Sequence, residues 1–194
     1  MLNENFVYVS IILSSIGGAI YLYLTLKGKV KPNKVTWFLW GAIPMIAFFA
    51  QIKEGVGIQS LLTFMVGFIP FLIFFTSFLN RKAFWKITKF DIICGLFSIL
   101  GVIFWLATGV GVLAILFSII ADAIAGIPTV VKSIKEPETE SYIAFALTTI
   151  GTIITLLTID NWNFATYSFP IYLLIINAFL ALIIWSKIGK RFTS

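Results

Sequence analysis

The stretch Lys31-Pro32-Asn33-Lys34-Val35-Thr36-Trp37 has a counterpart about 105 residues further along the chain. The counterpart is Glu136-Pro137-Glu138-Thr139-Glu140-Ser141-Tyr142. In each copy a hydroxyl residue follows the proline by four positions, and then come an aromatic residue and an apolar segment. Each copy lies in a charged loop between the first and second of three apolar segments. A chain that repeats three helices on either side of a linker is predicted to be a duplicated helical bundle.

Composition predicts an integral membrane protein. Hydrophobic residues make up 60% of the 194 residues, and charged residues only 11%. A soluble domain of this size could not cover so large an apolar fraction. The chain has no histidine and a single cysteine, Cys94, which excludes histidine-based acid–base chemistry and disulfides within the chain. We therefore predict no enzymatic activity, no cofactor and no metal site.

Seven apolar segments are long enough to be expected as transmembrane helices. They comprise residues 6–26, 34–51, 58–79, 91–108, 112–134, 141–158 and 166–186. The expected fold is thus an all-α polytopic membrane protein. We divide it into a first triple-helix bundle (residues 1–80), a linker helix with its flanking loops (81–111), and a second triple-helix bundle with a short tail (112–194).

The positions of the basic residues support this count. Seven crossings place 13 of the 14 Lys and Arg residues on one side, and only Lys53 falls opposite. By the positive-inside rule the C-terminus is predicted to be cytoplasmic and the N-terminus outside the cell membrane. The net charge of +6 then indicates contact with anionic lipid rather than with nucleic acid. Because seven is odd, the two bundles are expected to be parallel, about an axis along the membrane normal.

The stretch Pro128-Thr129-Val130-Val131-Lys132-Ser133, continuing to Ser141, resembles the signature of the PQ-loop superfamily, which includes the SWEET sugar transporters. Thr129 stands where that family has glutamine. The three-one-three layout is also similar to that of the nicotinamide riboside transporters, with Trp37, Phe38 and Trp40 as a tryptophan-rich helix. Both resemblances imply membrane transport. The SWEET resemblance further implies that Asn177, with Ser77 as its counterpart, holds a sugar between the third helices of the two bundles.

Asp122 is the sharpest candidate for a binding residue because it is the acidic residue in the middle of an apolar span. A carboxyl group there costs roughly 2.5–3.5 kcal/mol on insertion scales, so it should face a cavity or a partner. It would then accept hydrogen bonds from a solute or couple transport to protons, unless it only bonds a neighbouring hydroxyl group. Trp40, Trp105 and Gln51 are further candidates, since an indole can stack on a ring and an amide can form hydrogen bonds.

Three prolines interrupt predicted helices: Pro44, Pro70 and Pro128. Each removes a backbone hydrogen bond near mid-membrane, so they are expected to be hinges or static kinks. Other aromatic residues lie at span ends and are predicted to be interfacial anchors: Trp37, Trp85, Tyr142, Trp162 and Trp185. The acidic run Glu136, Glu138 and Glu140 is expected to be a solvated loop.

The sequence therefore predicts a transporter or facilitator of a small polar solute, sugar-like or vitamin-like, that works by alternating access between two bundles. The expected partners are the lipid bilayer and this solute. A receptor or assembly factor of the same fold, without transport activity, is the alternative. The sequence leaves the substrate, the coupling ion and the oligomeric state open, a homo-oligomer included.

Overall fold

The computed structural model describes residues 2–83, 85–108 and 110–188, apart from the side chains of residues 98, 101, 102 and 104–108. This part of the chain is all-helical, without a strand. It contains seven α-helices and two short 3-10 helices: α1 (Phe6–Leu26), α2 (Lys34–Lys53), α3 (Ser60–Thr76), η1 (Arg81–Ala83), α4 (Lys89–Thr108), α5 (Gly111–Lys135), η2 (Pro137–Thr139), α6 (Tyr142–Leu157) and α7 (Phe164–Ser186).

The prediction of seven helices is confirmed, and α1 has the predicted bounds. The largest difference is in α3, which ends at Thr76 rather than at residue 79. Ser77 follows as the C-cap, and its hydroxyl group donates a 2.6 Å hydrogen bond to the carbonyl oxygen of Phe74. Apolar content alone does not predict where this helix ends. The hydroxyl group of Ser77 bonds the backbone of the last turn, and such a bond competes with the hydrogen-bond pattern of the helix.

Asparagine side chains begin two of the helices. The Oδ1 of Asn33 accepts hydrogen bonds from the backbone N–H groups of Val35 (3.1 Å) and Thr36 (3.3 Å), at the start of α2. The Oδ1 of Asn163 accepts a 3.1 Å bond from the N–H of Thr166 in α7. These caps satisfy N–H groups that have no partner within the helix, and so they fix where each helix starts.

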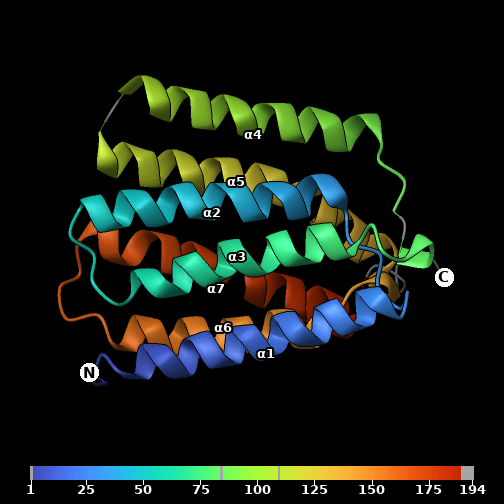
Figure 1. Cartoon of the computed structure of the whole chain (residues 1–194), viewed down its shortest axis with the longest axis horizontal. Coiled ribbons are helices and arrows are strands. Elements are labelled where there is room, and N and C mark those ends of the chain that lie inside the picture. The colour runs from blue at the N-terminus through green and yellow to red at the C-terminus, as the bar shows by residue number, and fades with distance from the viewer. Residues whose placement is uncertain (1, 84, 109, 189–194) are drawn as a thin grey trace.

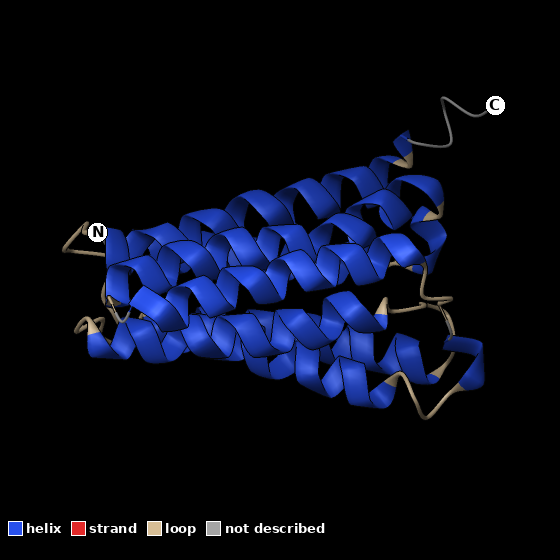
Figure 2. Cartoon of the chain, turned by 90° about the horizontal axis from the view of Figure 1, so that it is seen from above, coloured by secondary structure: helices blue, strands red, loops and turns tan. Residues whose placement is uncertain are grey.

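Six of the helices form a closed ring in the order α1, α3, α2, α5, α7, α6, in which each helix packs on the next and α6 packs on α1. In each half of the chain the third helix therefore lies between the first and the second. Helix α4 lies outside the ring, against α5 and α2 (Figure 1). Figure 2 shows the same helices running along one common long direction.

The two halves meet through close backbone contacts between α1 and α6. A Cβ atom at Gly17 would lie 2.9 Å from the carbonyl oxygen of Ala144. A Cβ atom at Gly151 would lie 2.8 Å from that of Ser10. Such contacts leave no room for a side chain, and small residues at helix interfaces are typical of packing within membranes.

Two pairs of helices begin at nearly the same spacing along the chain, whereas α2 and α6 begin 108 positions apart, at Lys34 and Tyr142. Helices α1 and α5 begin 105 positions apart, at Phe6 and Gly111. Helices α3 and α7 begin 104 positions apart, at Ser60 and Phe164. Residues 105 positions apart are called equivalent below.

In the part of the chain that the structure describes, four helices are long and apolar enough to cross a membrane: α1, α2, α5 and α7. Helices α3 and α6 are apolar but shorter. Large apolar side chains also lie exposed on the outer surface, among them Ile12, Phe49, Phe75 and Leu182. These features are compatible with a membrane protein, because lipid can cover such a surface.

The loops that carry most of the basic residues gather at one end of the ring. The Nδ2 of Asn80, after α3, donates a 2.6 Å hydrogen bond to the carbonyl oxygen of Leu26 at the end of α1. The N–H of Lys31, before α2, donates a 3.0 Å bond to the carbonyl oxygen of Thr139, before α6. We call this the basic end. Lys53 lies at the far end of α2.

Candidate functional site

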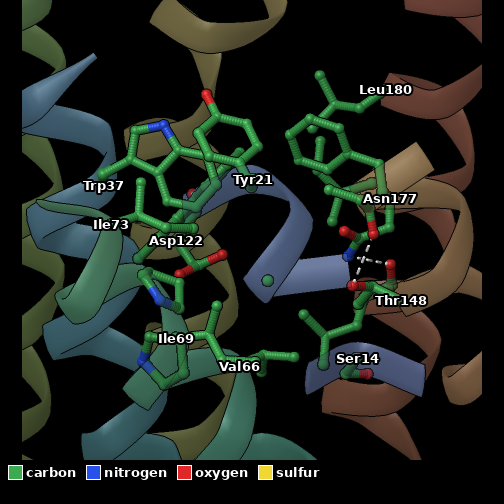
Figure 3. Close-up of a pocket in the computed structure, with 18 residues that line it drawn as sticks. Ser14, Tyr21, Trp37, Val66, Ile69, Ile73, Asp122, Thr148, Asn177 and Leu180 are labelled. Carbon is green, nitrogen blue, oxygen red and sulfur yellow. Dashed lines mark hydrogen bonds between the residues drawn. The ribbon is translucent and has the colours of Figure 1, made fainter. Parts of the chain in front are cut away.

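A cavity of about 70 Å³ lies inside the ring (Figure 3). All six ring helices contribute to its wall, and among the described residues α4 contributes none. The lining residues are Ser14, Gly18 and Tyr21 of α1; Trp37, Trp40 and Pro44 of α2; Val66, Ile69, Pro70 and Ile73 of α3; Asp122 of α5; Ala144, Phe145 and Thr148 of α6; and Leu173, Ile176, Asn177 and Leu180 of α7.

The cavity brings together five residues that the sequence singled out. Asp122, Asn177 and Trp40 line it, although they lie on three different helices. Pro44 and Pro70 also line it, so the interruptions of α2 and α3 lie beside the cavity. These positions are compatible with the predicted roles of the three binding candidates and of the two prolines.

Other predicted residues lie elsewhere. Gln51 is buried at the end of α2, where its Nε2 donates a 3.2 Å hydrogen bond to the carbonyl oxygen of Ala165. Ser77 caps α3 and does not reach the cavity, so the predicted pairing of Asn177 with Ser77 has no counterpart in its wall. Pro128 is buried in α5 without lining the cavity. The side chain of Trp105 lies outside the described residues.

The carboxyl group of Asp122 is only half satisfied by its neighbours. Its Oδ2 accepts a 2.6 Å hydrogen bond from the hydroxyl group of Tyr172. Its Oδ1 is buried and has no hydrogen-bond partner among the described residues. The indole Nε1 of Trp40 donates a 3.2 Å bond to the backbone oxygen of Asp122, which holds this turn of α5 against α2. A buried polar atom without a partner is costly, and at a cavity wall it indicates a ligand.

Four aromatic rings pack together at the cavity: Tyr21, Trp37, Trp40 and Phe145. We call them the aromatic cluster. The ring centres of Tyr21 and Trp37 are 4.5 Å apart, and those of Trp37 and Trp40 are 5.5 Å apart. The interpretation of Trp37 as an interfacial anchor is wrong, because only 4% of its surface is exposed. The sequence repeat was the signal that could have predicted the aromatic cluster, because Trp40 and Phe145 are equivalent residues.

Polar side chains of α1, α6 and α7 complete the wall. Figure 3 shows Asn177 and Thr148 across the cavity from Asp122 and Trp37. The Nδ2 of Asn177 donates a 2.9 Å hydrogen bond to the carbonyl oxygen of Leu173, and the hydroxyl group of Thr148 donates one of 3.1 Å to Ala144. The Oγ of Ser14 is buried and has no partner among the described residues. These groups can form hydrogen bonds with a small molecule.

A buried ion pair lies close to the aromatic cluster, at the basic end. The Nζ of Lys132 lies 2.6 Å from Oε1 of Glu140, and both side chains are at most 1% exposed. The other carboxylate oxygen of Glu140 accepts a 2.6 Å hydrogen bond from the hydroxyl group of Tyr21. Lys132 also donates to the backbone oxygen of Lys31. The prediction of a solvated acidic run is therefore wrong for Glu140, because distant parts of the chain cover it.

No family model, curated protein or solved structure matches this chain. Its function is therefore inferred from the geometry of the site itself. Asp122 is the single carboxyl group among the lining residues, and this wall contains no cysteine, lysine or arginine. Among the described residues no group of three potential metal ligands occurs. The arrangement suits binding of a small molecule, whereas acid–base or nucleophilic catalysis needs paired groups.

Proposed function

We propose that this chain is a multi-pass membrane protein that transports a small polar solute across the cell membrane. The solute would bind in the central cavity. The observation that carries the proposal is the buried Oδ1 of Asp122, which has no hydrogen-bond partner among the described residues and lies at the wall of a cavity lined by six apolar helices. A carboxyl group in such a position costs several kcal/mol unless it has a partner, and ionisable groups within membrane helices mark solute and ion pathways.

The proposed architecture is two parallel three-helix bundles, α1–α3 and α5–α7, joined by α4. The ring order supports it, since the contact of α1 with α6 is the equivalent of the contact of α5 with α2. The matching start points of α1 and α5 support it as well. This is the arrangement that the resemblance to the PQ-loop superfamily implies. The basic end would face the cytoplasm and the N-terminus the outside, as the positive-inside rule requires.

Contacts between the halves at both ends support alternating access. At the basic end Tyr21 bonds Glu140 at 2.6 Å. At the opposite end Gln51 bonds the carbonyl oxygen of Ala165, and Gln59 donates a 3.3 Å bond to that of Thr158. Rocking of one bundle against the other would release one set of contacts while the other set holds.

Permeation through reconstituted protein tests this function. Liposomes with and without the purified chain are mixed with small polar solutes, and swelling is followed by stopped-flow light scattering. The solutes are glycerol, urea, glycine, ethanolamine and choline. We expect the protein to increase permeation of at least one of them.

Two matched variants connect permeation to the cavity. Thr148→Phe fills the cavity from α6 and should abolish the increase. Ile150→Phe changes an exposed residue of the same helix and should leave permeation unchanged. Elution of both variants as folded protein in size-exclusion chromatography is the control. Permeation equal to that of empty liposomes, or equal in the two variants, would contradict the proposal and favour a receptor or assembly factor.

A further inference from the structure

We infer that the solute is a small organic cation whose ammonium group pairs with Asp122 while its carbon atoms contact the aromatic cluster. The inference rests on the proposed function, which requires a polar solute in this cavity but does not state its charge.

The charge of the cavity wall favours a cation. Asp122 brings a carboxyl group into the cavity, and no lysine or arginine is among the lining residues. The hydroxyl group of Tyr172 bonds only Oδ2, which holds the carboxyl group in place and leaves Oδ1 without a hydrogen-bond partner among the described residues. An organic cation carries the opposite charge and removes the cost of an isolated buried carboxylate, and a primary ammonium group also donates a hydrogen bond to Oδ1.

The aromatic cluster also favours a cation. Asp122 is held directly beside it, because Trp40 donates a 3.2 Å hydrogen bond to the backbone oxygen of Asp122. The rings of Trp37 and Trp40 meet edge to face, 5.5 Å apart, and the ring of Phe145 lies 6.4 Å from each. Aromatic faces attract cations within about 6 Å, and several rings around one site are typical of quaternary ammonium recognition. A neutral polyol gains less from such a wall.

Binding to the purified chain tests the inference. The probes are choline and ethanolamine, each with a neutral analogue of similar shape: 3,3-dimethylbutan-1-ol for choline and propan-1-ol for ethanolamine. Thermal shift and isothermal titration calorimetry measure binding to the detergent-solubilised protein. We expect at least one of the two cations to bind and its neutral analogue to bind at least tenfold more weakly. The analogue lacks the positive charge that pairs with Asp122 and, in the case of ethanolamine, also the N–H groups that donate to its carboxylate.

Two variants locate the effect. Asp122→Asn keeps the shape of the side chain and an oxygen that can accept from Tyr172, and it should weaken cation binding at least tenfold. Asp160→Asn makes the same change of charge at an exposed loop residue and should leave binding unchanged.

Equal binding of cations and neutral analogues, no binding of either cation, or full cation binding by Asp122→Asn would each overturn the inference. The liposome permeation assay separates failure of this inference from failure of the proposed function. Permeation of a neutral solute that Thr148→Phe abolishes would leave transport standing while the charge assignment falls.

Discussion

Trp40 and Phe145 are equivalent residues in the two halves of the chain, and their rings meet edge to face with centres 6.4 Å apart. Their neighbours are equivalent as well. Trp40 packs on Gly126, where a Cβ atom would lie 3.0 Å from the indole ring. Phe145 packs on Tyr21, with ring centres 6.4 Å apart. The larger indole of Trp40 thus packs on glycine, and the smaller ring of Phe145 packs on tyrosine. The equivalent positions therefore complement each other in volume.

Gly126→Leu should destabilise the protein by forcing the indole of Trp40 from its place. Overpacking of a core typically costs about 1–3 kcal/mol. We expect a lower midpoint of thermal unfolding in detergent, and partial recovery when Trp40→Ala is added. Gly57→Leu is the control, because a Cβ atom there makes only an ordinary contact with Gln59. A double variant no more stable than Gly126→Leu alone would show that the two positions do not share this space.

The ion pair of Lys132 with Glu140 should respond unequally to single and double substitution. Removing one partner of a buried pair leaves the other charge uncompensated and costs about 3–5 kcal/mol. We expect Lys132→Met and Glu140→Gln each to lower the unfolding midpoint strongly, and the double variant to lower it less than either. Lys135→Met removes the charge of an exposed lysine three residues further along the same helix, and it should change the unfolding midpoint little. Additive losses in the double variant would argue against a coupled pair.

Substitution of Asn33 should destabilise the protein for two separate reasons. It caps α2, and its Nδ2 also donates a 3.0 Å hydrogen bond to the buried carboxylate of Asp91, at the start of α4. Loss of a cap costs about 1 kcal/mol, and loss of a hydrogen bond to a charged group costs about 1.5–3 kcal/mol, although Asp91 keeps its bonds from Thr88. We expect Asn33→Ala to destabilise more than Asn33→Ser, which can keep the cap but loses the bond to Asp91. Equal unfolding midpoints for the two variants would show that the cap does not contribute to stability.

The proposed orientation makes a simple labelling prediction. Asp160→Cys and Lys29→Cys each place a thiol at an exposed loop position in a Cys94→Ser background, at opposite ends of the ring. A membrane-impermeant maleimide should label Asp160→Cys in intact cells. It should label Lys29→Cys only after the cells are permeabilised. The reverse pattern would invert the topology, and labelling of both in intact cells would contradict the count of crossings.

Periodicity and apolar length were sufficient to predict the seven helices, because each element is longer than the apolar minimum for a membrane span or close to it. The repeat identified the loop before α2 and the loop before α6, and these lie together in the structure. Tertiary contacts could not be predicted in this way. Glu140 lies in an acidic loop of the sequence, yet it is buried, because Tyr21, 119 residues away, and Lys132 of the preceding helix both bond its carboxylate.

The candidate site was predictable where a residue type was out of place in its segment. Asp122 stood out because a carboxyl group is costly inside an apolar helix. Asn177 was indicated by the resemblance to the SWEET transporters. Tyr21, Phe145 and Tyr172 gave no such signal, since aromatic residues are ordinary in membrane helices. Gln51, near the end of α2, is polar and buried, but it donates its hydrogen bond to the backbone oxygen of Ala165 in α7. Polarity alone therefore did not distinguish the cavity wall from a helix end.

Accessibility of the cavity from the two sides of the membrane distinguishes alternating access from a static cavity. The variant Thr148→Cys, in a Cys94→Ser background, places one thiol at the cavity wall. Its reaction with an impermeant thiol reagent is measured in intact cells and in inside-out vesicles. If the bundles alternate around a solute site, the thiol will react from both sides, and a bound solute will slow both reactions. A thiol that reacts from one side only, or from neither, would contradict alternating access.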